Sequence, residues 1–432
     1  MNILMMTNTY KPMVGGVSRS VESFSQEYRN LGHRVVVVCP RYRQKTEQEK
    51  DVVRVPAIPN FNGSDFSVQL PIPGVVTSLL RDFRPDVVHS HHPYLIGDTA
   101  LRIAAKYNVR LVYTFHTFYE RYTHYVPADS EGLKRFVVSL YTGYADLADQ
   151  VFAPSESVAG ELERRGVETK IDVVPTGIDV EFFRKGHGKK LRQSLGIPDD
   201  AIVVGLVSRI APEKNINFLS SSVASLMEKG KGCHFMIVGS GPSEGEVRSM
   251  FRNKGLQKRL HITGTLEGKD LVDSYHAMDV FAFASLTETQ GLVLTEAMAA
   301  GVPVVALQAS GTSDVVKNGW NGRLVPARHE KDFVSALEWF CCLEQEHKRK
   351  LSENAQKTAQ NFSKQNCAKK ALALYQSVMQ RDFVFRKHRD SPWDRARRLI
   401  KAEWELITTK TRATKSAIKD PYREETEQQG RG

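Results

Sequence analysis

The first 180 residues alternate between short apolar runs and amphipathic segments, a pattern typical of a parallel α/β domain. Apolar positions at helical spacing predict helices over about 17–31 and 130–150. Apolar runs rich in β-branched residues predict buried strands at Asn2–Met6, Arg34–Cys39, Asp86–His89, Arg110–Phe115 and Gln150–Ala153. Because strands separated by helices pair in parallel, this part predicts a doubly wound sheet.

The same alternation starts again near residue 200, with a helix expected over about 217–229. Strands are predicted at Ile202–Val207, His234–Val238, His261–Thr263, Val280–Ala284 and Val304–Ala306. We therefore expect a second Rossmann-like domain, joined to the first by a hinge within Pro175–Lys190. The domain boundaries that we predict are 1–178, 179–362, a helix over 363–382 returning to the first domain, and a basic, partly disordered tail over 383–432.

Length and composition agree with this organisation. The 432 residues favour two or three domains, and 41% hydrophobic with 25% charged residues is ordinary for a globular chain. No apolar run approaches the ~18 residues of a membrane-spanning helix. The N-terminus has no basic region before its apolar residues, and the five cysteines form no Cys-x-x-Cys pair. We therefore expect a cytoplasmic protein without a signal peptide, a disulfide framework or a structural zinc site.

The net charge of +11 is concentrated near the C-terminus. Residues 386–419 contain eleven Lys or Arg and four Asp or Glu, which gives +7, together with Trp393 and Trp404. Such a segment binds an anionic surface or is a solvated charged helix. Its aromatic residues are too sparse to stack nucleic-acid bases, so an anionic membrane is the expected surface. The helix over 130–150 is a second candidate, although packing within its domain is favoured there.

The clearest chemical signal is the run from Ser285 to Val305. A buried strand ends at Ser285, Gly291 opens a helix, and Glu288 and Glu296 are eight positions apart. The first N–H groups of a helix bind anions, and ligands of open α/β sheets bind at the carboxyl ends of strands. Either glutamate alone is explained by a helix start or an exposed surface, whereas the whole string favours a functional site.

Glu288 and Glu296 with the following Ala-Met-Ala-Ala-Gly-Val-Pro-Val resemble the retaining glycosyltransferases of family 4. The resemblance implies the GT-B fold, with two Rossmann-like domains, an active-site cleft between them, and here a basic helical C-terminal tail. It implies a retaining hexosyltransferase, with Glu288 at the donor-sugar hydroxyls and Glu296 at the ribose. The amides facing the diphosphate would be those of Thr289, Gln290, Gly291 and Leu292, although many members have Phe at the position of Gln290.

Two cations follow the predicted strand Ile202–Val207. Arg209 and Lys214 match the Arg…Lys pair of the family, and fixed cations there can neutralise a leaving diphosphate without a metal. Without the resemblance, two solvated surface charges would be favoured. The resemblance also implies donor contacts at Gly16, Gly239, Thr265 and Leu266. For the glycines, a tight turn is the alternative explanation.

The segment after the strand Arg110–Phe115 is dense in aromatic and polar residues. The resemblance places His116 near the donor sugar, as a catalytic residue together with Arg209, Lys214 and Glu288. The acceptor-binding candidates in this segment are Tyr119, Glu120, Tyr122 and His124. A second group, His89, His91 and His92, has poor spacing for metal ligands, and we expect neither a metal nor another cofactor besides the nucleotide-sugar.

Two strings, Thr-Glu-Thr-Gln-Gly at 287–291 and His-Thr-Phe-Tyr-Glu at 116–120, resemble the family members that glucosylate diacylglycerol. They imply a UDP-glucose donor, a lipid acceptor, and a peripheral position on the cytoplasmic face of a membrane. The alternatives are a UDP- or GDP-sugar, GDP-mannose above all, with a phosphatidylinositol, soluble or polysaccharide acceptor. A sugar-nucleotide epimerase and a nucleotide-binding protein without transfer activity are alternatives of another class. The sequence does not indicate an oligomeric state.

Overall fold

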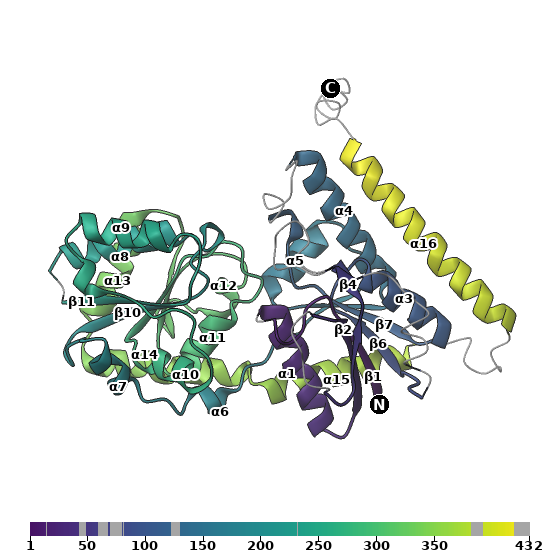
Figure 1. Ribbon diagram of the computed structural model, residues 1–432, viewed down its shortest axis with the longest axis horizontal. Helices are drawn as coiled ribbons and strands as arrows, with labels where there is room; N and C mark the ends of the chain where they lie inside the picture. Colours follow the sequence, from purple (N-terminus) through teal and green to yellow (C-terminus); the bar gives the residue numbers. More distant parts are fainter. Residues whose placement is uncertain are drawn as a thin grey trace. The chain divides into compact units, whose positions relative to one another are not determined.

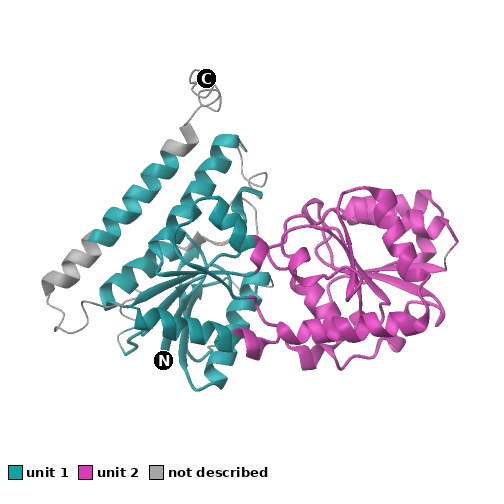
Figure 2. Ribbon diagram, turned by 180° about the vertical axis from the view of Figure 1, so that it is seen from behind, with its two compact units in different colours: residues 1–154, 158–174, 368–432 teal, residues 155–157, 175–367 magenta. Residues whose placement is uncertain are grey.

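The computed structural model describes residues 1–13, 15–42, 49–58, 68–69, 80, 82–121, 130–230, 232–381 and 392–418. Two compact units make up the chain (Figure 2). Unit 1 contains Met1–Pro154, Val158–Val174 and the chain from Ala368 onward, and unit 2 contains Ser155–Ser157 and Pro175–Cys367. We predicted a domain boundary after residue 178, and in the structure the chain passes from unit 1 to unit 2 after Val174.

Unit 1 is built on a parallel sheet with the strand order β3-β2-β1-β6-β7-β8-β9 (Figure 1). Its strands are β1 (Asn2–Met6), β2 (Arg34–Pro40), β3 (Val52–Val55), β6 (Val87–Ser90), β7 (Arg110–Thr114), β8 (Gln150–Ala153) and β9 (Ile171–Val173), beside a short antiparallel pair, β4 (Ala57–Ile58) and β5 (Val68–Gln69). Its helices are α1 (Gly16–Asn30), α3 (Ile96–Tyr107), α4 (Glu131–Leu147), α5 (Glu156–Arg164), α15 (Lys364–Gln380) and α16 (Pro392–Ile418), of which α5 and α15 begin in unit 2.

Burial on both faces explains the continuous apolar strands of this sheet. Ile3 through Met6 in the central strand β1 are fully buried, although successive side chains point to opposite faces. The strand order reverses between β1 and β6, which are hydrogen-bonded neighbours with Met5 opposite His89. Ligands of doubly wound sheets bind at such a reversal, beside the carboxyl ends of the strands.

Unit 2 repeats this architecture with the order β12-β11-β10-β13-β14-β15, again parallel throughout. Its strands are β10 (Ile202–Val207), β11 (Cys233–Val238), β12 (Leu260–Ile262), β13 (Val280–Phe283), β14 (Val304–Leu307) and β15 (Gly322–Val325). Its helices are α6 (Val180–Phe183), α7 (Gly188–Ser194), η3 (Pro212–Lys214), α8 (Ile216–Glu228), α9 (Glu244–Asn253), η4 (Gln257–Arg259), α10 (Gly268–His276), α11 (Leu292–Ala299), α12 (Thr312–Val315), α13 (Glu330–Cys341) and α14 (Gln345–Asn361).

The predicted α/β class with two doubly wound sheets is confirmed. Strands β3, β9 and β15 were not predicted, because each is an edge strand of three or four residues in which one charged residue, Arg54, Asp172 or Arg323, interrupts the apolar run. In the C-terminal tail, residues 392–418 form the helix α16, which packs on α4 and α3, whereas residues 383–391 and 419–432 lie outside the described residues. None of the helices in the described ranges is long and apolar enough to cross a membrane.

Candidate active site

In unit 2, the candidate site residues follow the two strands at which the strand order reverses. β10 and β13 are hydrogen-bonded neighbours, and Arg209 and Lys214 come after β10, while Glu288 comes after β13. Two contacts join the loops that carry them. The side-chain amide of Asn215 donates to the carbonyl of Ala284 at 3.2 Å, and the Thr287 hydroxyl donates to the carbonyl of Glu213 at 3.4 Å. The reversal point of this sheet therefore carries the charged residues that the sequence singled out.

Lys214 and Glu288 form an ion pair, with 2.5 Å between Lys214 Nζ and Glu288 Oε1. Their side chains are only 22% and 19% exposed, so the pair is partly withdrawn from water. Arg209, which is 53% exposed, lies 3.6 Å from the carboxylate of Glu213. The site thus contains a partly buried cation, Lys214, that is paired with a carboxylate, and a second cation, Arg209, that is exposed to solvent.

The start of α11 provides the backbone amides beside these charges. Gly291 caps the helix in the left-handed region at φ 72°, which favours glycine, and the Leu294 N–H donates to its carbonyl at 2.9 Å. The first N–H groups of a helix have no acceptor four residues earlier. Gly311, after β14, allows the close approach of this loop, because a Cβ on it would lie 2.7 Å from the backbone nitrogen of Gln290.

Gln290 holds the loop in place through its side chain. Its Oε1 accepts from the Thr176 N–H at 2.7 Å, and its Nε2 donates to the Thr176 carbonyl at 2.8 Å. Nearby, the Ser155 hydroxyl donates to the carbonyl of Thr289 at 2.7 Å. Both polar atoms of the Gln290 side-chain amide are therefore engaged with the backbone of Thr176. The sequence had not indicated Thr176, Ser155 or Gly311.

Glu296 lies one and a half helical turns beyond Gly291 and is 3% exposed. The Tyr275 hydroxyl, from α10, donates to Glu296 Oε2 at 2.7 Å and fixes the carboxylate. Burial of a carboxylate requires such a partner. The sequence had not indicated Tyr275, because nothing in its own neighbourhood distinguishes it from a core tyrosine.

The ends of β10, β11 and β12 are joined backbone to backbone. A Cβ on Gly239 would lie 2.0 Å from the carbonyl oxygen of Ser208, so the close approach of β10 requires glycine there. The Gly239 N–H donates to the carbonyl of Gly264 at 2.8 Å. Next to it, Thr265 is exposed and Leu266 packs against the core of unit 2. These three predicted donor positions therefore lie at neighbouring strand ends.

In unit 1, His116 follows β7 and faces a second histidine. His116 Nε2 and His91 Nδ1 are 2.9 Å apart, and the two rings stack. His91 is 1% exposed, and its Nε2 is a buried atom for which the described residues provide no hydrogen-bond partner. The sequence indicated His91 only as a poorly spaced candidate metal ligand, whereas in the structure its ring contacts His116.

The other histidines of this cluster belong to the core. His89 contacts the hydroxyls of Tyr375 at 2.5 Å and Thr114 at 2.6 Å, and His92 Nδ1 accepts from the Asn8 N–H at 3.1 Å. Burial lowers the pKa of His89, His92 and His116 to about 3, so these rings are neutral at neutral pH. Over the described part of the chain, no three His, Cys, Asp or Glu side chains form a potential metal site.

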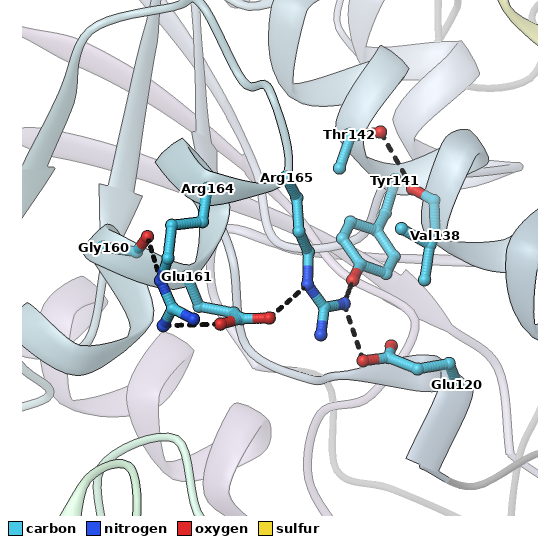
Figure 3. A network of polar contacts seen from close by, with 8 residues as sticks. All are labelled: Glu120, Val138, Tyr141, Thr142, Gly160, Glu161, Arg164 and Arg165. Carbon is cyan, nitrogen blue, oxygen red and sulfur yellow. Dashed lines mark hydrogen bonds and ion pairs between the residues drawn. The ribbon is translucent and has the colours of Figure 1, made fainter. Parts of the chain in front are cut away.

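The acceptor candidates that the structure describes lie after His116. The Tyr119 ring packs on Tyr94, and Glu120 forms an ion pair with Arg165 at 2.7 Å. Arg165 also contacts the Tyr141 hydroxyl and the carboxylate of Glu161 (Figure 3). This network borders a pocket lined by Glu120, Glu131, Lys134, Arg135, Val138, Ser139, Thr142 and Arg165. The other two candidates, Tyr122 and His124, lie outside the described residues.

The two glycines of the predicted loop of unit 1 lie at the start of α1, with Gly15 as its cap and Gly16 as its first residue. A Cβ built on Gly15 or Gly16 would have no described atom within 4 Å. The backbone of Gly15 is extended at φ 176°, a conformation open to any residue. The described part of the fold therefore imposes no requirement for glycine at these two positions.

Comparisons with known proteins agree with this architecture. Residues 14–182 match the model of Glycosyltransferase Family 4, and residues 188–358 match that of Glycosyl transferases group 1. The fold resembles that of Anabaena HepE, solved with UDP, at a TM-score of 0.71 and 22% identity, over 87% of this chain and all of that one. The chain therefore belongs to the family 4 glycosyltransferases of the GT-B fold and is a hexosyltransferase, as the motif around Glu288 and Glu296 implied.

Two curated relatives indicate which kinds of glycosyltransferase the chain resembles. The chain is 28% identical to the alpha-monoglucosyldiacylglycerol synthase of Acholeplasma laidlawii over 397 residues, which are 88% of this chain and 98% of that protein. It is 32% identical to the D-inositol 3-phosphate glycosyltransferase of Actinosynnema mirum over 302 residues, which are 67% of this chain and 72% of that protein. The expected similarity to the diacylglycerol glucosyltransferases is confirmed.

Proposed function

We propose that this protein transfers glucose from UDP-glucose to the hydroxyl of diacylglycerol at a membrane surface, with retention of the anomeric configuration. The observation that carries the proposal is the Lys214–Glu288 pair beside the start of α11 at the reversal point of the unit 2 sheet. Similarity to the Acholeplasma synthase over nearly the full length of both chains supports the lipid acceptor. The UDP bound in the HepE structure supports uridine as the nucleoside of the sugar donor.

In the proposed reaction, the acceptor oxygen attacks the anomeric carbon from the side on which UDP departs. The bond between that carbon and the diphosphate oxygen breaks, and the leaving phosphate takes the hydroxyl proton. Negative charge grows on the diphosphate during this step. Lys214, Arg209 and the first N–H groups of α11 stabilise that charge, which is the largest electrostatic task of the reaction.

The ion pair suggests how donor binding organises the site. Without a ligand, Lys214 and Glu288 neutralise each other. A bound diphosphate competes for Lys214, and the Glu288 carboxylate then becomes an acceptor for the hydroxyls of the donor sugar. Glu296, fixed by Tyr275, is proposed to bind the ribose hydroxyls at greater depth in the same unit.

The residues of unit 1 are proposed to complete the reaction. His116, oriented by His91, donates or accepts a hydrogen bond at the donor sugar. The open surroundings of Gly16 fit a close approach of ligand to the backbone, since the described residues do not require glycine there. Glu120, which lines the pocket beside Arg165, and the preceding residue Tyr119 are the proposed acceptor contacts. We propose that the protein lies peripherally on the cytoplasmic face of a membrane, as the sequence predicted.

A different donor and acceptor form the second candidate. The 32% identity with the inositol-phosphate glycosyltransferase favours an inositol-type acceptor, with a UDP- or GDP-sugar as donor. A transfer screen separates the two candidates. The purified full chain would be given UDP-glucose, UDP-galactose or GDP-mannose with diacylglycerol vesicles, with inositol phosphate, or with neither.

The proposal predicts an α-glucosyldiacylglycerol from UDP-glucose and diacylglycerol, with the anomer assigned by NMR. Transfer only to inositol phosphate would establish the second candidate. Epimerisation of the donor without any acceptor would remove both candidates, and so would tight nucleotide binding without turnover.

A further inference from the structure

Helix α16 is fastened to unit 1 along one face. It lies beside α4 and α3 (Figure 1), and Ala402, Leu406 and Ala413 on this face are at most 3% exposed. The contact with α4 is close, since a Cβ on Gly143 would lie 2.6 Å from the Thr409 methyl group. The small residues Gly143, Ala402 and Ala413 let the helices approach each other closely.

Two ion pairs fix the rotation of α16 about its own axis. Arg102 in α3 binds the carboxylate of Glu403 through two nitrogens, at 2.5 and 3.0 Å. Lys410 binds Asp98 at 2.5 Å, and the Asp98 side chain is only 6% exposed. Because Glu403 and Lys410 are seven positions apart, they lie on one side of the helix, and the two ion pairs determine the direction in which its remaining face points relative to unit 1.

That remaining face carries hydrophobic side chains in water. Trp404 is 70% exposed and Ile407 is 57% exposed, the two highest values for large hydrophobic residues in the described part of the chain. They are one helical turn apart, so they form a single apolar patch. Lys401 and Arg412 are exposed on the same helix, within the basic segment of residues 386–419.

We infer that this outward face of α16 is the surface that docks unit 1 on an anionic lipid bilayer. Indole rings favour the headgroup level of a bilayer, and an amphipathic helix with basic residues beside its apolar side chains lies in the plane of that interface. The net charge of +7 over residues 386–419 complements anionic headgroups. The inference rests on the proposed function for its purpose, which is to bring the enzyme to a lipid acceptor.

A second copy of the chain fits this face less well. Trp404 and Ile407 offer on the order of 300 Å² of apolar surface, whereas a stable interface buries ~800 Å² on each partner. A bilayer has no such minimum area, because each inserted side chain and each nearby cation adds to the binding.

The test measures binding of the full chain to vesicles that contain no acceptor. Vesicles of phosphatidylcholine alone and of equal parts phosphatidylcholine and phosphatidylglycerol would be sedimented with wild type, Trp404→Ser and Trp404→Ser/Ile407→Ser. Trp320→Ser, which removes a tryptophan that is 48% exposed in unit 2, is the matched control. We expect the mixed vesicles to bind wild type and Trp320→Ser equally, and the double variant about tenfold less or weaker still.

Charge and fold are controlled separately. Arg412→Gln should weaken binding to the mixed vesicles about fivefold, and added salt should weaken it further. Unchanged thermal unfolding of Trp404→Ser/Ile407→Ser would show that α16 stays packed. Wild-type binding by that double variant, or no binding of wild type to the mixed vesicles, would overturn the inference. A dimer in ultracentrifugation that is lost in the double variant would assign the face to a second copy instead.

An activity measurement separates this inference from the proposed function. Transfer to a short-chain diacylglycerol dispersed in detergent should be equal in wild type and Trp404→Ser/Ile407→Ser, while transfer to diacylglycerol in mixed vesicles should fall with binding. If no form of diacylglycerol is glucosylated, the proposed function fails, and the vesicle-binding results still decide the role of α16.

Discussion

Gln290→Leu tests how the donor loop is held. Leucine has a similar volume and removes both hydrogen bonds to Thr176, at 2.7 and 2.8 Å, while Gln290 and Thr176 are 5% and 6% exposed. The N–H and the carbonyl of Thr176 would then be buried without these partners. Each such group costs about 1–3 kcal/mol, so the loop should lose about 2–6 kcal/mol of local stability. Water that enters the site would reduce this figure.

The assay is hydrogen exchange followed by mass spectrometry, because a chain with two units need not unfold in a single step. Peptides covering Thr176 and the loop from Glu288 to Leu292 should lose protection in Gln290→Leu, and UDP affinity measured by calorimetry should fall with it. Gln308→Leu, a change at an exposed glutamine after β14, is the control and should shift stability by less than about 0.5 kcal/mol. Wild-type protection and UDP affinity in Gln290→Leu would refute the reasoning.

Three further predictions concern the candidate site residues of unit 1 and unit 2. Gly16→Ala should leave thermal stability unchanged, since its Cβ meets no described atom, but should lower turnover if ligand approaches the backbone there. Glu296→Gln should raise the KM for the nucleotide-sugar about 10–100-fold, with a smaller change in kcat, because the charged hydrogen bond proposed between Glu296 and the ribose would be lost. Burial lowers the pKa of His89 and His116 to about 3, so the unfolded chain binds more protons below its ordinary histidine pKa of about 6.5. The stability of unit 1, followed by hydrogen exchange, should therefore be full above pH ~6.5 and fall as the pH drops towards 3.

The central strands and the helix start at Gly291 could be predicted from the sequence, because each depends on local patterns. A strand buried on both faces is a continuous apolar run, as in β2 and β11, and a glycine directly before an apolar helix predicts its start. The edge strand β15 could not be predicted, because the strand is short and Arg323 interrupts its apolar residues.

The partners within the sites could not be predicted, because they are distant in sequence. Lys214 and Glu288 are 74 positions apart, and Gln290 and Thr176 are 114 apart. Position after a strand indicated that Lys214 and Glu288 share one edge of the sheet, but their direct pairing depends on how two loops fold. Likewise, the sequence contained the histidines at 89–92 but did not show which of them meets His116, a question decided by strand register.

Turnover of Lys214→Ala tests the central claim most directly. That claim is that a cation held beside Glu288 stabilises the departing diphosphate. In UDP-glucose transfer to diacylglycerol, kcat should fall about 100–1000-fold, with circular dichroism and thermal unfolding unchanged, while Lys269→Ala on the exposed surface of α10 keeps wild-type turnover. Turnover of Lys214→Ala close to that of wild type would contradict the account.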